Sequence, residues 1–87
     1  MSDKLQLNIL TPAKTICTDQ AVDTVTMPGA NGELGILPGH ATLLTLLGPG
    51  KVTYLQGSQL HSFEISGGFA EVVEDRLILL LEKVEPV

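Results

Sequence analysis

Hydrophobic and polar residues alternate along much of this chain, and the alternation predicts β-strands. Leu5, Leu7 and Ile9 are separated by polar residues, which is the period of two that a half-buried strand shows. β-branched residues dominate positions 22–27, a composition that suits a pleated, partly buried surface. Residues 41–47 are apolar and fit either a buried strand or a short piece of helix. Further strands are predicted at residues 14–18, 51–56, 59–65, 69–73 and 77–81.

Turn-forming residues recur about every eight to twelve positions between these segments, a spacing typical of a β-sandwich or barrel. Two of the turns, Gly57-Ser58 and Glu74-Asp75, are short enough for tight hairpins. No long stretch repeats its apolar residues with the helical period of 3.6. The pattern therefore predicts an all-β sandwich. The other turn signals are Thr11-Pro12-Ala13, Asp19-Gln20, Pro28 to Gly32, Gly48-Pro49-Gly50 and Ser66-Gly67-Gly68.

Three finer expectations follow from the same pattern. Residues 77–81 carry apolar side chains on both alternating faces, so this strand is expected to lie centrally and be covered on both sides. The tail at residues 82–87 is charged and contains a proline, and it is expected to fray. Ile16 and Cys17 are expected on opposite faces of their strand, with Cys17 as a buried, inert thiol.

Residues 32–44, with the sequence GELGILPGHATLL, form the most distinctive stretch of the chain. Glycine reaches backbone angles that other residues adopt only at a cost, and proline fixes one angle and removes a donor. We therefore expect a loop of defined shape that presents Glu33 and His40. From the residues alone, this loop is either a shaped connection between strands or a binding loop.

Composition narrows the possible partners of the domain. The 87 residues are enough for one domain, residues 1–87, with an aliphatic core, because 44% are hydrophobic and only 3% aromatic. Charged residues make up 17%, below the usual quarter, which suggests that some surface is covered by a partner. The net charge is −5 and the five basic residues are scattered, so nucleic acid and anionic lipid are unfavourable ligands. No signal peptide or apolar run of membrane-spanning length is found, which predicts no direct membrane insertion and suggests a soluble chain.

The candidate chemical groups do not assemble into a catalytic set, a cofactor site or a metal site. The single cysteine forms no internal disulfide and suits a reducing compartment. His61 is expected to have a surface or cross-strand role, because it lies in a predicted hairpin strand. The acids Glu71, Glu74 and Asp75 lack the alternating oxygen ligands of a calcium loop, and no Lys-Ser/Thr follows the glycine pair 67–68. We therefore predict no catalytic, cofactor-binding or metal-binding residues and no enzymatic activity in this chain alone.

Several motifs in sequence order resemble one family. Residues 33–44, ELGILPGHATLL, are similar to the most characteristic segment of the epsilon subunit of rotary F-type ATP synthases, called delta in mitochondria. The segments LGPG at 47–50 and ISGGFAEV at 65–72 match further family motifs. The resemblance implies a flattened sandwich or barrel of about ten mostly antiparallel strands. It also implies a non-catalytic, cofactor-free stalk subunit that links the gamma subunit to the c-subunit ring and thereby couples proton flow to ATP synthesis in the catalytic head.

The resemblance also implies where the partners bind. Glu33, Leu34 and Gly35 are expected to contact the c ring, and Thr11, His40, Thr42 and Leu43 the gamma subunit. The implied location is the cytoplasmic face of a bacterial inner or photosynthetic membrane, with the plastid stroma as the alternative. Thr42 replaces a common family proline, and the two-helix C-terminal hairpin of many members is expected to be absent. The competing interpretation is a free-standing β-sandwich adaptor or ligand-binding module.

Overall fold

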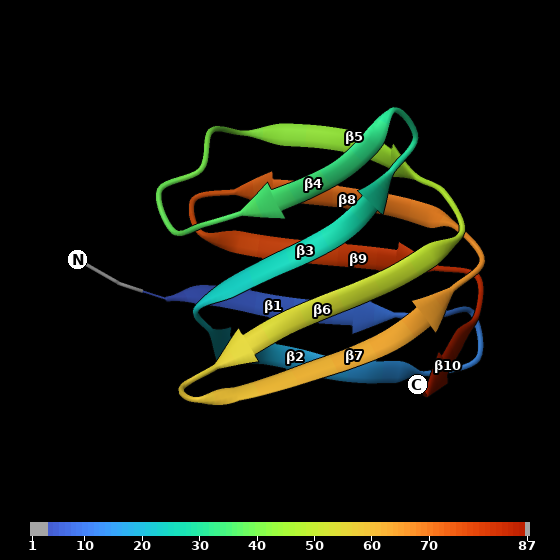
Figure 1. The fold of residues 1–87 in the computed structure, drawn as a ribbon, viewed down its shortest axis with the longest axis horizontal. Helices are drawn as coiled ribbons and strands as arrows, with labels where there is room; N and C mark the ends of the chain where they lie inside the picture. Colours follow the sequence, from blue (N-terminus) through green and yellow to red (C-terminus); the bar gives the residue numbers. More distant parts are fainter. Residues whose placement is uncertain (1–3, 87) are drawn as a thin grey trace.

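Ten strands in two layers make up the fold (Figure 1). The computed structural model describes residues 4–86, and within that range it contains no helix, so none that could span a membrane. The all-β prediction is confirmed, and within the ambiguous segment 41–47 the residues Leu43–Leu47 form a strand rather than a helix. The strands are β1 (Leu5–Leu10), β2 (Thr15–Val22), β3 (Thr24–Gly29), β4 (Gly32–Ile36), β5 (Leu43–Leu47), β6 (Gly50–Gln56), β7 (Gln59–Ile65), β8 (Gly68–Val73), β9 (Arg76–Leu81) and β10 (Val84–Pro86).

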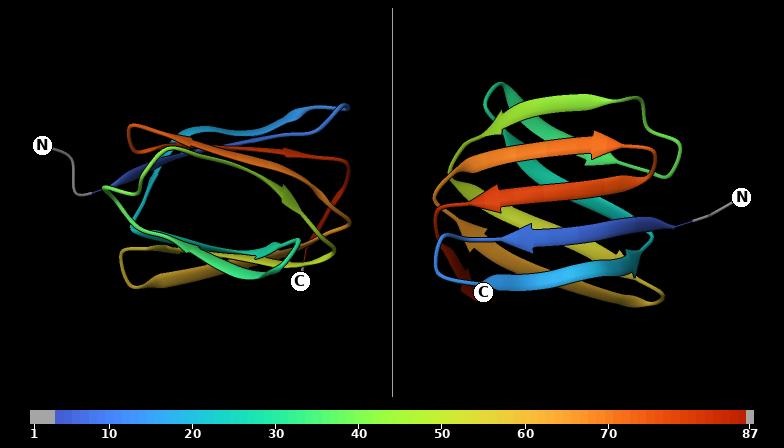
Figure 2. Two further views of the ribbon diagram at one scale, coloured as in Figure 1. Left: turned by 90° about the horizontal axis from the view of Figure 1, so that it is seen from above. Right: turned by 180° about the vertical axis from the view of Figure 1, so that it is seen from behind.

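One sheet curls over to make both layers, as the view from above in Figure 2 shows. The first layer has the order β4-β3-β6-β7-β10, and the second has the order β5-β8-β9-β1-β2. The layers join where Gly29 of β3 pairs with Leu47 of β5. At the opposite seam, the Gln20 side-chain amide donates to the Gln56 side chain at 3.2 Å. All neighbouring strands are antiparallel except β1 and β9, so the prediction of a mostly antiparallel, flattened sandwich is confirmed.

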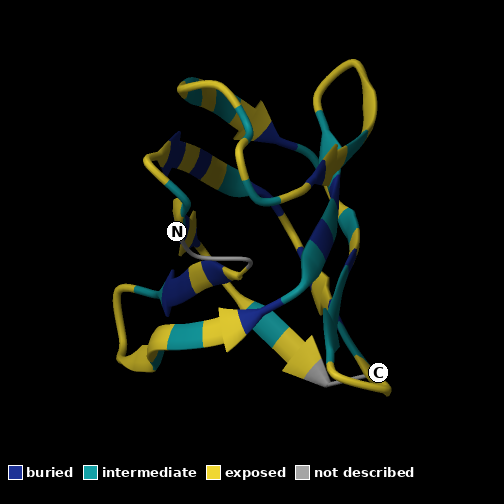
Figure 3. Cartoon of the chain, turned by 90° about the vertical axis from the view of Figure 1, so that its left-hand side faces the viewer, coloured by how far each residue is buried: buried dark blue, intermediate teal, exposed yellow. Residues whose placement is uncertain are grey.

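An aliphatic core fills the space between the layers. Successive side chains of a strand point to opposite faces, so every second residue enters the core, and buried and exposed positions alternate in Figure 3. Among the residues whose burial the structure describes, Phe63 is the only buried aromatic one. The core residues are Leu5, Leu7, Ile9, Val22, Val25, Met27, Ile36, Leu47, Val52, Phe63, Ile65, Ala70, Val72, Leu77, Leu79 and Leu81.

Strand β9 differs from its prediction. Leu77, Leu79 and Leu81 are buried, but Leu80 is 51% exposed and Ile78 is only partly buried. The expectation that both faces are covered is therefore wrong. The reason is that β9 lies in the second layer, whose outer face is not covered by any element of residues 4–86.

Two further expectations, a turn at Asp19-Gln20 and a fraying tail, are also wrong. Asp19-Gln20 does not turn the chain but forms a bulge within β2, where Asp19 has a φ of 48°. The buried Asn8 side chain stabilises the bulge by accepting the Asp19 N–H at 3.0 Å. The tail does not fray at residues 84–86, because β10 pairs with β7 and Val84 packs against the core. Residue 87 lies outside the described residues.

Asp23, between β2 and β3, bonds to Lys4 before β1 and to Gly57 in the β6–β7 turn. These bonds lead to a prediction of how stability depends on pH. The Lys4 side chain donates to the Asp23 carboxylate, and this bond, followed by the Gly57 N–H at 2.8 Å, lowers the pKa of Asp23. Because the pKa of Asp23 is lower in the folded state, its ionised carboxylate stabilises the folded state at pH values above the pKa of an unfolded aspartate, which is about 4. This stabilisation is lost as the pH falls through the pKa of the folded state. We expect Asp23→Asn to be less stable than the wild type at pH 7 in urea denaturation, with the difference vanishing towards pH 2. A difference that grows on acidification would contradict this assignment.

Candidate functional site

Residues 32–44 are only partly a loop. Residues Gly32–Ile36 form β4, which pairs along its length with β3, and the exposed tip of that hairpin is Ala30 and Asn31. Glu33 lies opposite Pro28 in the strand, so the expectation that a loop presents Glu33 is wrong. Gly29 permits the tight hairpin, because a Cβ there would lie 2.6 Å from the Gly32 carbonyl oxygen. The sequence misled because glycine-rich segments have low strand propensity, and here the pairing with β3 outweighs it.

The loop is residues 37–42, between β4 and β5. Within it, the His40 N–H donates to the Leu37 carbonyl at 3.1 Å, and Gly39 has a φ of +86°. The Nδ1 atom of His40 lies 2.7 Å from the Ala41 carbonyl oxygen. The Gly39 N–H donates to the Asp75 carboxylate at 2.6 Å, which ties the loop to the β8–β9 turn. His40 therefore helps to shape a turn and remains partly exposed.

The residues predicted to contact the c ring lie together on β4, at an edge of the first layer. Glu33 and Gly35 are exposed, and their positions alternate with that of Leu34. Leu34 is partly buried and packs against the core. An exposed strand edge with one carboxylate is suited to polar contacts, and the Leu34 side chain contributes mainly to folding.

The residues predicted to contact gamma lie at two ends of the second layer. Thr42 is exposed and, with His40, lies near the start of β5. Thr11 follows β1 at the opposite end, where its N–H donates to the Lys14 carbonyl at 2.9 Å. Leu43 packs partly against the core. The structure therefore does not bring these four residues together in one cluster.

A row of apolar side chains crosses the outer face of the second layer near the end where Thr11 lies. The strand registers place Leu46 beside Phe69, Phe69 beside Leu80, and Leu80 beside Leu10. Leu46 is 54% exposed and Phe69 is 50% exposed. We call these four residues, Leu46, Phe69, Leu80 and Leu10, the outer apolar row. The row was not predicted from the sequence, although the apolar residues on the second face of positions 77–81 were a signal for it.

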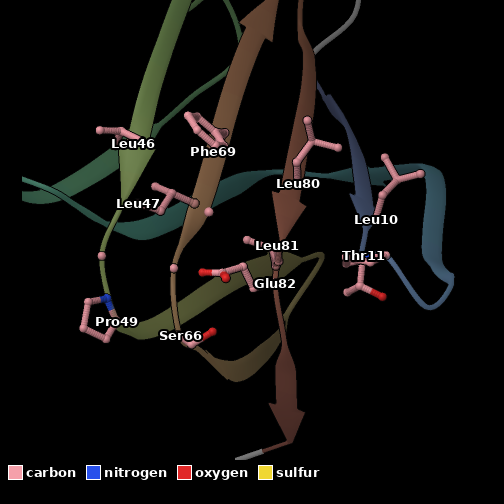
Figure 4. Close-up of a pocket in the computed structure, with 14 residues that line it drawn as sticks. Leu10, Thr11, Leu46, Leu47, Pro49, Ser66, Phe69, Leu80, Leu81 and Glu82 are labelled. Carbon is pink, nitrogen blue, oxygen red and sulfur yellow. The ribbon is translucent and has the colours of Figure 1, made fainter.

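The whole outer apolar row borders a pocket of about 600 Å³ (Figure 4). Its apolar wall is formed by the row itself together with Leu47 and Pro49. Thr11, Ser66 and Glu82 add polar groups to its lining. A pocket of this composition can accept an apolar side chain and orient a neighbouring polar group.

Two further candidate groups, His61 and Cys17, pack against other parts of the fold. His61 stacks on Tyr54 across the β6–β7 hairpin with ring centroids 4.9 Å apart, which confirms its cross-strand role. Cys17 faces the core and Ile16 faces outwards; the thiol donates to the Leu7 carbonyl at 3.5 Å. Burial raises the pKa of the Cys17 thiol and keeps it protonated at neutral pH. Among residues 4–86, no three His, Cys, Asp or Glu side chains converge on a possible metal position.

Comparison with known proteins identifies the family. The model of the ATP synthase delta/epsilon chain β-sandwich domain matches residues 4–87. The chain belongs to this family. The ATP synthase epsilon chain of Lawsonia intracellularis is 46% identical over 85 residues, covering 98% of this chain and 63% of its own length. Epsilon chain 2 of Syntrophotalea carbinolica is 40% identical over 85 residues, with 98% and 61% covered, so the chain spans about three fifths of these relatives.

Chains in solved structures of mitochondrial ATP synthases share the same sandwich fold. A chain in the cryo-EM structure of the Euglena gracilis mitochondrial ATP synthase, comprising OSCP, F1 and c-ring, superposes with a TM-score of 0.94 at 25% identity. The match covers 99% of this chain and 55% of that one. A chain from the central stalk and c-ring of the Tetrahymena thermophila enzyme shares the fold, with a TM-score of 0.80 at 17% identity over 98% of this chain and 69% of that one.

Proposed function

We propose that this chain is a non-catalytic central-stalk subunit of a proton-translocating ATP synthase. It joins the gamma subunit to the c-subunit ring, so that rotation driven by proton flow is coupled to ATP synthesis in the catalytic head. The observation that carries the proposal is the match to the family over residues 4–87. Through the complex, the chain is held at the membrane surface, on the cytoplasmic side in a bacterium.

The two layers suit transmission of torque because a rigid body must be held at two separate places. The close-packed aliphatic core resists deformation of one layer against the other. The β4 edge lies in the first layer and the outer apolar row lies on the second. Two partners can therefore bind at the same time without competing for surface.

The gamma subunit is assigned to the outer face of the second layer. The outer apolar row crosses the strands of this face at the Thr11 end, and His40, Thr42 and Leu43 lie at the other end of the same layer. A stable interface buries about 800 Å² on each partner. The accessible surface of the chain is 5208 Å², and an exposed apolar row is the part of it whose burial is most favourable.

The c ring is assigned to the β4 edge, through Glu33 with Leu34 and Gly35. A single exposed carboxylate contact contributes about 0–1 kcal/mol to binding. Glu33→Arg removes this contact and also places a positive charge where the ring would have bound a negative one, so we expect it to weaken ring binding by up to about tenfold. Binding of the variant to detergent-solubilised c ring, with gamma present, measures the effect. Glu64→Arg is the matched control, because Glu64 is an exposed acid in β7 of the same layer. If both variants weakened ring binding equally, Glu33 would not be a specific contact of the ring.

Reconstitution tests the proposed function as a whole. Gamma, the c ring and the catalytic head are assembled in proton-tight vesicles with and without this chain, and ATP synthesis driven by a pH gradient is measured. We expect the chain to bind the gamma–ring assembly and to raise the yield of ATP per proton translocated. If it bound neither gamma nor the ring, a free-standing adaptor would become the better interpretation.

A further inference from the structure

Asp75 lies where three segments of the chain meet. It is in the β8–β9 turn, at a φ of 63°, and its main-chain carbonyl accepts the Gln6 N–H of β1 at 2.8 Å. Its side-chain Oδ1 accepts the Gly39 N–H at 2.6 Å. Figure 1 shows the β8–β9 turn and the loop between β4 and β5 at the same end of the molecule. One residue therefore connects the loop at residues 37–42 to the second layer.

The loop depends on this contact for its position. Within residues 4–86, its other hydrogen bonds are local, from the His40 N–H to Leu37 and between the His40 ring and Ala41. Local bonds define the shape of a turn but leave its orientation to the flanking strands. The Asp75 carboxylate is a charged acceptor, and such acceptors form shorter and stronger bonds than neutral ones.

We infer that Asp75 is a positioning residue for partner binding: its carboxylate holds residues 37–42 in place, so that His40 and Thr42 are presented in a fixed orientation at one end of the outer face. This inference rests on the proposed function, in which the gamma subunit binds that face. A loop ordered before binding loses less conformational entropy on association, and affinity rises accordingly.

Asp75→Gly removes the carboxylate and keeps the turn, because glycine adopts a positive φ without strain. Glu74→Gly is the matched control: Glu74 has a φ of 48° in the same turn, and its carboxylate makes no hydrogen bond or ion pair among the described residues. Asp75→Asn is the conservative variant, since its amide oxygen can still accept the Gly39 N–H and asparagine tolerates a positive φ.

Two measurements are made on the 87-residue chain. In the absence of any partner, the amide hydrogen of Gly39 is expected to exchange about three- to tenfold faster in Asp75→Gly, because one hydrogen bond is lost. In Glu74→Gly and Asp75→Asn its exchange is expected to stay near the wild-type rate. The dissociation constant for the isolated gamma subunit is expected to rise by about three- to tenfold in Asp75→Gly only.

The outcomes separate this inference from the proposed function. If Gly39 exchange were unchanged in Asp75→Gly, or rose equally in Glu74→Gly, the positioning role would be refuted. If Gly39 exchange rose while gamma affinity stayed the same, the role of Asp75 in partner binding would be refuted. If the wild-type chain failed to bind gamma, the proposed function would fail, and the exchange data alone would still decide whether Asp75 anchors the loop.

Discussion

Replacing Gly68 with alanine lowers the free energy of unfolding by about 2–4 kcal/mol, the combined cost of backbone strain and overpacking. Gly68 begins β8 with a φ of +154°, a region that L-residues rarely adopt. An added Cβ would overlap the Leu80 carbonyl oxygen and lie 3.0 Å from the Cα of Leu81. Those are backbone atoms of the neighbouring strand β9, so they cannot move aside as a flexible side chain can.

Urea denaturation measures this loss, and Gly48→Ala is its matched control. Gly48 lies in the nearby β5–β6 connection, has no positive φ, and has open space where its Cβ would be. The control is expected to change stability by no more than about 0.5 kcal/mol. If the two variants were equally stable, the backbone of β9 would have to move away from the added Cβ at little cost.

Replacing Phe69 with alanine weakens binding of the gamma subunit by about 2 kcal/mol, roughly thirtyfold in Kd. Phe69 is central in the outer apolar row, between Leu46 and Leu80, and its ring borders the pocket. Aromatic side chains that become buried at the centre of an interface contribute most to affinity. Titration calorimetry or surface plasmon resonance with isolated gamma gives the change directly.

The control for Phe69→Ala is Leu60→Ala. Leu60 is 68% exposed and lies on β7 in the first layer, away from the outer apolar row. Because both side chains are at least half exposed, both variants are expected to keep their unfolding free energy within about 1 kcal/mol of the wild type. A loss of gamma affinity in Leu60→Ala but not in Phe69→Ala would move the interface to the first layer.

The sequence predicts most of the fold because its strands and turns are encoded locally. Gly57-Ser58 and Glu74-Asp75 do form tight hairpins, and the alternation of Leu5, Leu7 and Ile9 marks a half-buried strand. β4 was missed although it pairs with the adjacent strand β3, because its glycines lower its strand propensity. β10 was missed because it depends on residues distant in sequence: it forms where β7 leaves an edge open.

The candidate site was less predictable for the same reason. The motif at residues 33–44 identifies the family, but the sequence does not reveal that Glu33 lies in a strand or that Leu43 faces the core. The outer apolar row joins residues from four strands, and its alignment depends on sheet register. The Asp75 contact with Gly39 spans 36 residues and leaves no local pattern.

The parallel pairing of β1 with β9 has a consequence for the order in which the chain folds. Of the ten described strands, β1 is synthesised first, but in the second layer it lies between β2 and the much later strand β9. The second layer therefore closes only after residues 76–81 have emerged, and until then the β1 edge of the β1–β2 hairpin has no neighbouring strand. Such non-local pairing slows folding, so the domain acquires its native core in a late, concerted step of synthesis and not strand by strand.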